Sequence, residues 1–184
     1  EEFDDIGILL FDFDGDNDLD LYVVSGGTFA SKNSEIYQDR LYLNIGNGKF
    51  KKTGNILPRE NSSGSVVTAA DFDRDGDLDL FVGGRIIPMN YPYPPRSLLL
   101  ENKNGRFIDI TNEKAPGLSD IGMVTSALWT DFNGDGDIDL MLAGEWMPVT
   151  IFINREGTFK NLTREYGLTN TVGWWNSISS GNFD

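Results

Sequence analysis

The chain has 184 residues, of which 39% are hydrophobic and 12% aromatic, a composition typical of a globular protein rather than a disordered one. Its formal net charge of −14 argues against nucleic-acid binding, and it has no apolar run of about 18 residues that could insert into a membrane. It has no cysteine and no histidine, which excludes a disulfide framework, thiolate chemistry and the usual transition-metal ligand.

The first predicted unit, residues 5–63, opens with an apolar strand over Ile6–Phe11. The acidic decapeptide D-F-D-G-D-N-D-L-D-L follows from Asp12 and leads into a second strand over Leu19–Val24. The phrase L-Y-L-N-I-G-N-G-K-F from Leu41 then predicts a β-hairpin, because an apolar strand meets an Asn/Gly turn and a strand that opens with Phe50.

The second unit, residues 64–122, repeats this order. A strand is predicted over Ser65–Ala70, the decapeptide D-F-D-R-D-G-D-L-D-L starts at Asp71, and a second strand covers Leu78–Val82. A proline-rich loop, I-P-M-N-Y-P-Y-P-P-R, precedes the hairpin phrase L-L-L-E-N-K-N-G-R-F, which ends in Phe107. The loop is an insertion in the shared pattern.

The third unit, residues 123–173, has predicted strands over Val124–Thr130 and Ile138–Ala143 around D-F-N-G-D-G-D-I-D-L, and its hairpin phrase I-F-I-N-R-E-G-T-F ends in Phe159. A fourth unit, residues 174–184, begins with a strand predicted over Trp174–Ser180. It reaches Asn182-Phe183-Asp184, where another decapeptide would begin.

Four strands per unit, repeated at a period of about 50 to 60 residues, predict an all-β fold made of β-propeller blades. Residues 1–184 are thus interpreted as a partial β-propeller of about three four-stranded blades and the start of a fourth. Because propellers typically need about four to eight blades, we expect the remaining blades to be supplied by a longer parent chain. The aligned phenylalanines are expected to pack between neighbouring blades.

The decapeptides are candidate calcium loops, because alternating carboxylates around a tight turn supply the oxygen ligands that Ca²⁺ prefers. Side chains at positions 1, 3, 5 and 9 would point at the ion, and position 7 would offer its backbone carbonyl. About three Ca²⁺ sites are predicted, with these ligands: Asp12, Asp14, Asp16, Asp18 and Asp20; Asp71, Asp73, Asp75, Asp77 and Asp79; Asp131, Asn133, Asp135, Asp137 and Asp139.

An EF-hand is the alternative calcium motif, but position 12 would then be a bidentate glutamate, and here it is Val23, Val82 or Leu142. A β setting is therefore predicted. Metal-free acidic turns are disfavoured, because uncompensated carboxylates this close repel one another. We expect the ion to staple the turn rather than to catalyse, with an affinity of about 10⁻⁴ to 10⁻³ M. Asn17 replaces the glycine of position 6 and tolerates a left-handed backbone.

The decapeptide resembles the FG-GAP/VCBS repeat of integrin α-chain propellers and of secreted repeat proteins. The phrases Y-P-Y-P-P-R-S from Tyr91, G-E-W-M-P from Gly144 and G-W-W-N-S-I from Gly173 further resemble secreted bacterial VCBS-repeat proteins related to the cartilage acidic protein family. The resemblance implies a seven- or eight-bladed β-propeller, calcium between the first two strands of each blade, and a secreted, periplasmic or cell-surface location.

Three functions are consistent with the sequence. The leading hypothesis is a non-enzymatic, calcium-stabilised binding scaffold for a protein or glycan ligand, because exposed aromatic side chains stack on sugars and anchor protein interfaces. The candidate ligand contacts are Trp146, Tyr91, Tyr93, Trp174 and Trp175. One of the two adjacent tryptophans is expected to be in the core.

The first alternative is part of a polysaccharide-active hydrolase or lyase that would pair Glu145 with a nearby aspartate. The second alternative is a purely structural spacer in a surface protein, which exposed aromatic residues that form no patch would favour.

Overall fold

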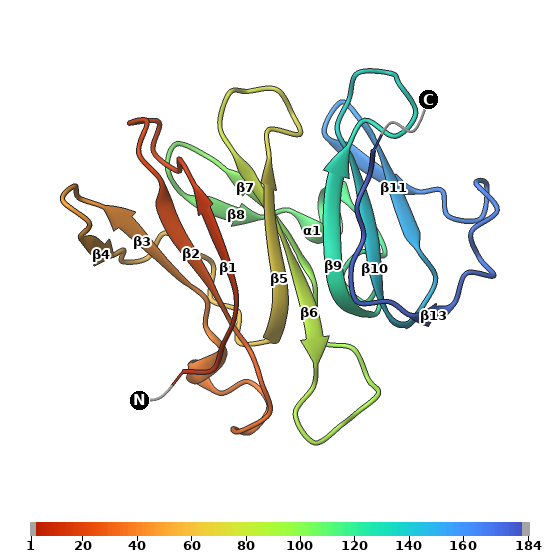
Figure 1. Cartoon of the computed structure of the whole chain (residues 1–184), viewed down its shortest axis with the longest axis horizontal. Coiled ribbons are helices and arrows are strands. Elements are labelled where there is room, and N and C mark those ends of the chain that lie inside the picture. The colour runs from red at the N-terminus through yellow and green to blue at the C-terminus, as the bar shows by residue number, and fades with distance from the viewer. Residues whose placement is uncertain (1–2, 182–184) are drawn as a thin grey trace.

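The computed structural model describes residues 3–181 and places three antiparallel β-sheets side by side (Figure 1). The strands are β1 Asp5–Phe11, β2 Asp20–Ser25, β3 Arg40–Asn44, β4 Phe50–Lys52, β5 Ser63–Ala70, β6 Asp79–Ile86, β7 Leu98–Asn102, β8 Phe107–Asp109, β9 Met123–Thr130, β10 Asp139–Met147, β11 Thr150–Arg155, β12 Thr158–Asn161 and β13 Gly173–Trp174. Two short helical turns, η1 Glu35–Tyr37 and α1 Thr111–Lys114, lie in connections.

Each sheet contains four strands in chain order, β1 to β4, β5 to β8 and β9 to β12, and β13 adds to the third sheet beside β10. Every neighbouring pair is antiparallel, as connections by tight turns require. The prediction of an all-β chain of four-stranded blades is confirmed. No helix in the described residues is long and apolar enough to cross a membrane.

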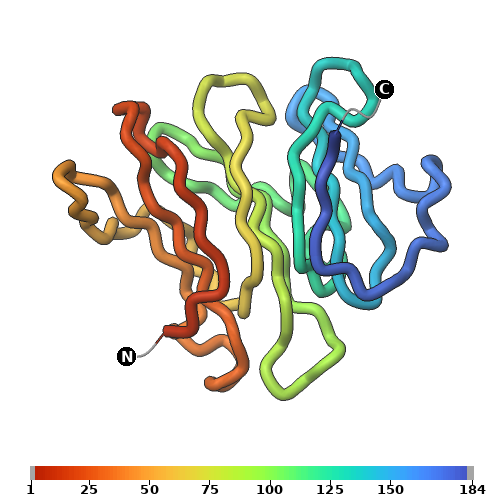
Figure 2. Tube along the Cα trace, in the orientation of Figure 1, coloured from red at the N-terminus to blue at the C-terminus, as the bar shows by residue number. Residues whose placement is uncertain are grey.

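The first strands of the three blades, β1, β5 and β9, lie next to one another along one side of the molecule (Figure 2). One side-chain hydroxyl in β5 and one in β9 form hydrogen bonds to the next unit. Ser65 Oγ donates to the Val124 carbonyl of the next blade at 2.6 Å, and Thr125 Oγ1 donates to the Trp175 carbonyl at the same distance. The segment after β13 therefore lies beside β9 much as β9 lies beside β5.

The fourth predicted strand, Trp174–Ser180, is wrong in its extent. Only Gly173 and Trp174 pair as a strand, and they pair with the end of β10 rather than with a fourth sheet. Residues 175–181 have no strand pairing of their own and contact β9 through side chains, as in the Ile178 N–H that donates to Ser126 Oγ. The predicted start of a fourth decapeptide lies outside the described residues.

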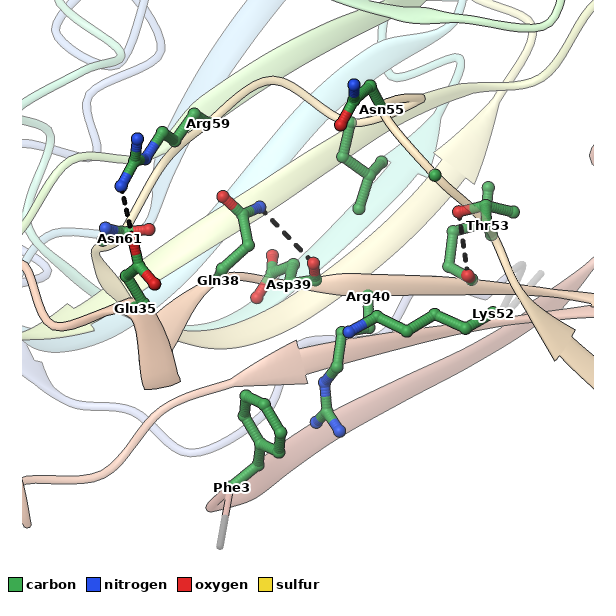
Figure 3. A pocket seen from close by; sticks show the side chains of 13 residues that line it. Phe3, Glu35, Gln38, Asp39, Arg40, Lys52, Thr53, Asn55, Arg59 and Asn61 are labelled. Carbon is green, nitrogen blue, oxygen red and sulfur yellow. Dashed lines mark hydrogen bonds and ion pairs between the residues drawn. The ribbon is translucent and has the colours of Figure 1, made fainter. Parts of the chain in front are cut away.

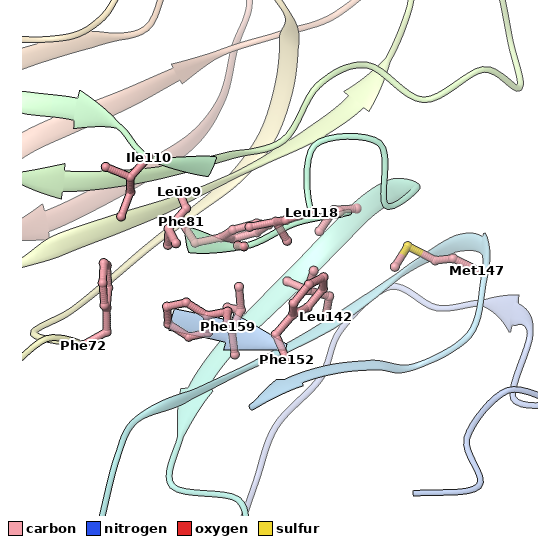
Figure 4. Packing of buried hydrophobic residues seen from close by; sticks show 12 residues of the cluster. Phe72, Phe81, Leu99, Ile110, Leu118, Leu142, Met147, Phe152 and Phe159 are labelled. Atoms are coloured by element: carbon pink, nitrogen blue, oxygen red, sulfur yellow. The ribbon is translucent and has the colours of Figure 1, made fainter. Parts of the chain in front are cut away.

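The hydrophobic core lies between the sheets, in two clusters. Figure 4 shows the cluster between the second and third blades, where Phe72 and Phe159 meet edge to face at 5.2 Å between ring centroids. The cluster between the first and second blades includes Phe107. Packing of the aligned phenylalanines between blades is thus confirmed for Phe107 and Phe159, which are 3% and 2% exposed, whereas Phe50 is 43% exposed.

The two ends of the blades carry different features. The three acidic loops lie together along the upper edge in Figure 1, whereas the proline-rich loop and β13 lie at the opposite edge. The fold thereby separates the candidate metal ligands from most of the candidate ligand-binding aromatic residues.

Candidate functional site

The acidic loops connect the first and second strands of each blade and share one backbone path. At position 4, φ is +76° at Gly15, +64° at Arg74 and +75° at Gly134. At position 6, φ is +69° at Asn17, +97° at Gly76 and +91° at Gly136. Two left-handed residues curl the chain so that the alternating carboxylates converge, and the left-handed conformation expected of Asn17 is confirmed.

The aspartate at position 9 is the fixed point of each loop. Asp20, Asp79 and Asp139 are all buried. In the second loop, Asp79 accepts the N–H of Phe72 at 3.4 Å on Oδ2 and that of Asn102 at 2.8 Å on Oδ1. The first and third loops repeat both bonds with their own residues. This carboxylate therefore joins the acidic loop to the third strand of its blade.

Other loop carboxylates hold the curl itself. Position 1 accepts the backbone N–H of position 6, at 3.0 Å for Asp12 and Asn17 and at 3.1 Å for Asp71 and Gly76. Position 5 accepts the N–H of position 7 at 2.9 Å in all three loops. These bonds orient the carboxylates, so the backbone of each loop contributes to their convergence.

The first two loops fit a hard divalent cation. Asp12, Asp14 and Asp20 bring carboxylate oxygens within 4.8 Å of one another, and so do Asp71, Asp73 and Asp79. Two oxygens in these loops, Oδ1 of Asp18 and Oδ1 of Asp71, are buried without a hydrogen-bond partner. Orphaned acceptors beside converging carboxylates are what a missing cation would leave.

The third loop differs, because Asn133 replaces an aspartate at position 3. Its Oδ1 accepts the N–H of Asp135 at 2.9 Å, and its Nδ2 donates to Asp135 Oδ2 at 2.8 Å. At positions 1, 3 and 9 the third loop has two carboxylates and one amide, where each of the other loops has three carboxylates. The predicted third ligand set therefore offers one negative charge fewer to a cation.

The pKa values of the loop carboxyl groups depend on their burial and on their neighbours. Burial, and then repulsion by neighbouring carboxylates, raises the pKa of Asp14 and of Asp73, while burial raises that of Asp79 to about 7. In the third loop, burial raises the pKa of Asp139, whereas the N–H of Asp137 and the Asn133 side chain lower the pKa of Asp135. Carboxylates with a raised pKa thus occur in all three loops, and a divalent cation would neutralise the negative charge that they concentrate.

An asparagine at the end of the third strand completes each site, and sequence reasoning missed this role. Asn44, Asn102 and Asn154 donate their backbone N–H groups to the position-9 aspartate, and their side chains accept an N–H from the following turn. The signal was present, since an asparagine precedes the turn of every hairpin phrase, directly after the apolar run at Asn44 and Asn154 and after Glu101 at Asn102. Its partner could not be read from the phrase alone.

Three of the five candidate ligand contacts gather at the end of the blades opposite the acidic loops. Trp146 Nε1 donates to the Tyr91 hydroxyl at 2.6 Å, and the Trp146 and Trp174 rings meet edge to face at 5.4 Å. These residues, here named the aromatic cluster, are 59%, 47% and 56% exposed. They come from β10, the proline-rich loop and β13, so two blades contribute.

Trp146 owes its exposure to a β-bulge. Glu145 pairs with Trp174 and Met147 with Gly173, and the register shift between them leaves Trp146 unpaired at φ +57°. A bulge of this kind re-aims a side chain. The adjacent Glu145 is buried and forms an ion pair with Arg85 of the second blade.

The remaining two candidates lie outside the cluster contacts. Tyr93 is exposed, and Trp175 is 40% exposed with its Nε1 donating to the Thr171 carbonyl at 2.9 Å. The expectation that either Trp174 or Trp175 is a core residue is wrong. The short β13 keeps the former at the surface, and the latter folds back over Gly173 rather than between sheets.

A cavity of about 490 Å³ lies on the first blade, lined by charged side chains that include Glu35, Arg40 and Arg59 (Figure 3). Asp39 lines it but is committed to structure, since its carboxylate accepts the Ser25 N–H and the Tyr22 hydroxyl, both at 2.8 Å. Burial raises the pKa of Asp39 to about 7. The group anchors β2 to the segment before β3.

Comparison with known proteins agrees with this architecture. Cartilage acidic protein 1 of Mus musculus is 30% identical over 171 residues, covering 86% of this chain and 24% of that protein. Cartilage acidic protein 1 of Homo sapiens is 29% identical over the same length, covering 86% and 23%. The chain thus spans about a quarter of these relatives. The family model for FG-GAP-like repeats matches residues 8–82 and 131–184, so the chain belongs to the FG-GAP-like repeat family.

Proposed function

We propose that this FG-GAP-like repeat chain is a calcium-stabilised, non-catalytic recognition scaffold that works outside the cytoplasm. The observation that carries the calcium assignment is the pair of carboxylate groups, Asp12 with Asp14 and Asp20, and Asp71 with Asp73 and Asp79. Bound there, Ca²⁺ would supply positive charge alone and no reactive group. The neighbouring orphaned oxygens support the same assignment.

The proposed extracytoplasmic location goes together with the affinity expected of these loops. That affinity, about 10⁻⁴ to 10⁻³ M, is the range of calcium sites in extracellular modules. A scaffold held by such sites is saturated outside the cell and depleted of calcium inside it.

The aromatic cluster is the proposed recognition surface for a protein or glycan ligand. Large aromatic groups at the surface supply contact area at low entropic cost, and the bond between Trp146 and Tyr91 fixes their relative positions. Since these exposed aromatic residues form a patch, the observation that would favour a pure spacer does not hold.

A non-catalytic role is proposed because the acidic residue next to Trp146 has a structural role. Glu145, the residue named for the hydrolase or lyase alternative, is buried and paired with Arg85. The chain also lacks histidine and cysteine, the residues most used for proton transfer and nucleophilic attack.

We also propose that another blade of a longer protein covers the outer face of the first blade. Ile8 and Phe50 are 67% and 43% exposed. At the same offsets in the second blade, Val67 and Phe107 are buried against the first blade. The repeat thus places apolar side chains where a preceding blade would bury them.

The recognition proposal is tested by measuring binding of the chain to arrayed oligosaccharides and extracellular proteins. The calcium concentration is about 1 mM, which is near the upper end of the expected dissociation constants. A double variant, Trp146→Ala with Trp174→Ala, is expected to lose the binding that the unmodified chain shows. The control is Phe29→Ala, because Phe29 is 87% exposed on a different loop. Equal binding by the double variant and the control would contradict the proposed surface.

A further inference from the structure

Arg74 occupies a position where the other two loops have glycine. It stands at position 4 of the second acidic loop with φ +64°, and Gly15 and Gly134 hold the same left-handed conformation. A side chain is disfavoured there, and a long charged residue in such a conformation calls for a compensating contact.

The compensating contact is made with the neighbouring blade. Arg74 Nη2 donates to the Gly136 carbonyl at 2.5 Å and lies 2.8 Å from Asp137 Oδ1, both in the third loop. Among the described residues, the hydrogen bonds of this guanidinium go to the third loop and not to its own. Arg74 belongs to the second loop but therefore places its positive charge beside the third.

The third loop has less unbalanced charge than the others for two reasons. It contains four carboxylates rather than five, because Asn133 stands at position 3. It also receives the Arg74 guanidinium, whereas the first loop contains no basic residue. Within residues 3–181, the orphaned loop oxygens belong to Asp18 and Asp71, in the first and second loops.

We propose that Arg74 is a built-in counter-charge of the third loop, which makes that loop the weakest of the three divalent-cation sites and joins the second and third blades without an ion. This inference rests on the calcium binding proposed above. A fixed positive charge beside a site repels an entering divalent cation. Because the Arg74 side chain is 62% exposed, water screens this repulsion to about three- to tenfold in affinity.

The proposal is tested by site-resolved calcium titration of the 184-residue chain with amide chemical shifts from nuclear magnetic resonance. The position-6 amides of Asn17, Gly76 and Gly136 each donate to the position-1 aspartate of their own loop, so each reports one site. In the unmodified chain, the Gly136 amide is expected to titrate at a several-fold higher calcium concentration than the other two.

Three variants separate charge from backbone strain. Arg74→Gly restores the residue of the other loops, Arg74→Gln keeps a long side chain without charge, and Arg74→Lys keeps the charge. The first two are expected to lower the midpoint of Gly136 by about three- to tenfold, with Asn17 unchanged, while Arg74→Lys stays near the unmodified midpoint. Because glycine adopts the left-handed conformation without steric cost, Arg74→Gly is expected to fold.

The outcomes distinguish the two proposals. If no reporter amide responds to calcium, the proposed calcium binding itself fails. If all three respond at one concentration, or Gly136 responds first, the counter-charge role of Arg74 is overturned. It is also overturned if Arg74→Gly tightens the third site and Arg74→Gln does not, since relief of strain would then account for the change.

Discussion

The aspartate at position 9 has two roles, one in the fold and one in the proposed metal site, and the sequence indicated only the second. It is buried, it accepts two backbone N–H groups, and it also belongs to the carboxylate group proposed to hold calcium. Its contribution to stability therefore has a part that does not depend on the ion. Removing it would leave two buried donors unpaired, whether or not calcium is bound.

We predict that Asp79→Ala lowers the free energy of unfolding by about 2 to 4 kcal/mol even in chelator, because the N–H groups of Phe72 and Asn102 lose their acceptor. The control is Asp77→Ala, which removes the same charge from an exposed residue of the same loop. It should change stability by less than about 0.5 kcal/mol in chelator. Urea unfolding measures both, and equal effects would refute the anchoring role.

The half-buried carboxyl of Asp39 predicts a pH dependence unrelated to the loops. Its pKa is about 7 in the folded chain because of burial, against 3.8 for an ordinary aspartate. The folded state thus holds a proton that the unfolded state releases, so this group's stabilising contribution is complete below about pH 4 and is lost as the pH rises through 7. The slope is at most about 1.4 kcal/mol per pH unit.

Asp39→Asn should flatten this slope between about pH 4 and 7 and make the chain relatively more stable at about pH 8 than the unmodified protein. Urea unfolding at a series of pH values, with calcium held constant, gives the comparison. Glu35→Gln is the control, since Glu35 lines the same cavity but is exposed. An unchanged slope in Asp39→Asn would show that Asp39 does not titrate in this range.

At the scale of strands and hairpins, the repeated phrases predicted which elements form. They did not predict which of these elements a neighbouring blade buries. The hairpin that ends in Phe159 and the hairpin that ends in Phe50 read alike, and both form. Within residues 3–181, another blade packs on that face of the first hairpin but not of the second. Burial depends on the neighbour, and a local pattern contains no information about whether a neighbour is present.

This difference predicts unequal costs for the same substitution. Phe159→Ala should destabilise the chain by about 3 to 5 kcal/mol, because it opens a cavity between the second and third blades. Phe50→Ala should cost less than about 1 kcal/mol, since Phe50 is 43% exposed. Denaturant unfolding of both variants provides the test, and equal losses would contradict the assignment of the interblade core.

For the candidate site, the sequence predicted the acidic loops but not the contacts that these loops make with distant residues. The spacing of carboxylates identified the loops, because alternation around a turn has a direct geometric consequence. The partners of Asp79 in β7, the reach of Arg74 into the next blade and the contact of Trp146 with Tyr91 join residues far apart in the chain. Such contacts follow from how blades stack, which no single repeat specifies.

In the molecule as a whole, blades meet through apolar faces, through hydroxyls between first strands and through Arg74 between acidic loops. The acidic loops lie along one edge, where their charges add (Figure 1). With a net charge of −14, the chain carries much of its self-repulsion there. Divalent cations at that edge would relieve the repulsion in all blades at once.

The most direct measurement is the melting temperature of the chain as calcium is added from a chelated start. Binding to the folded state alone stabilises it by about 2.7 kcal/mol per site at a hundredfold excess over the dissociation constant, so a saturable rise of about 10 °C or more is expected. Melting curves that superimpose in calcium and in chelator would contradict the account that divalent cations hold these blades together.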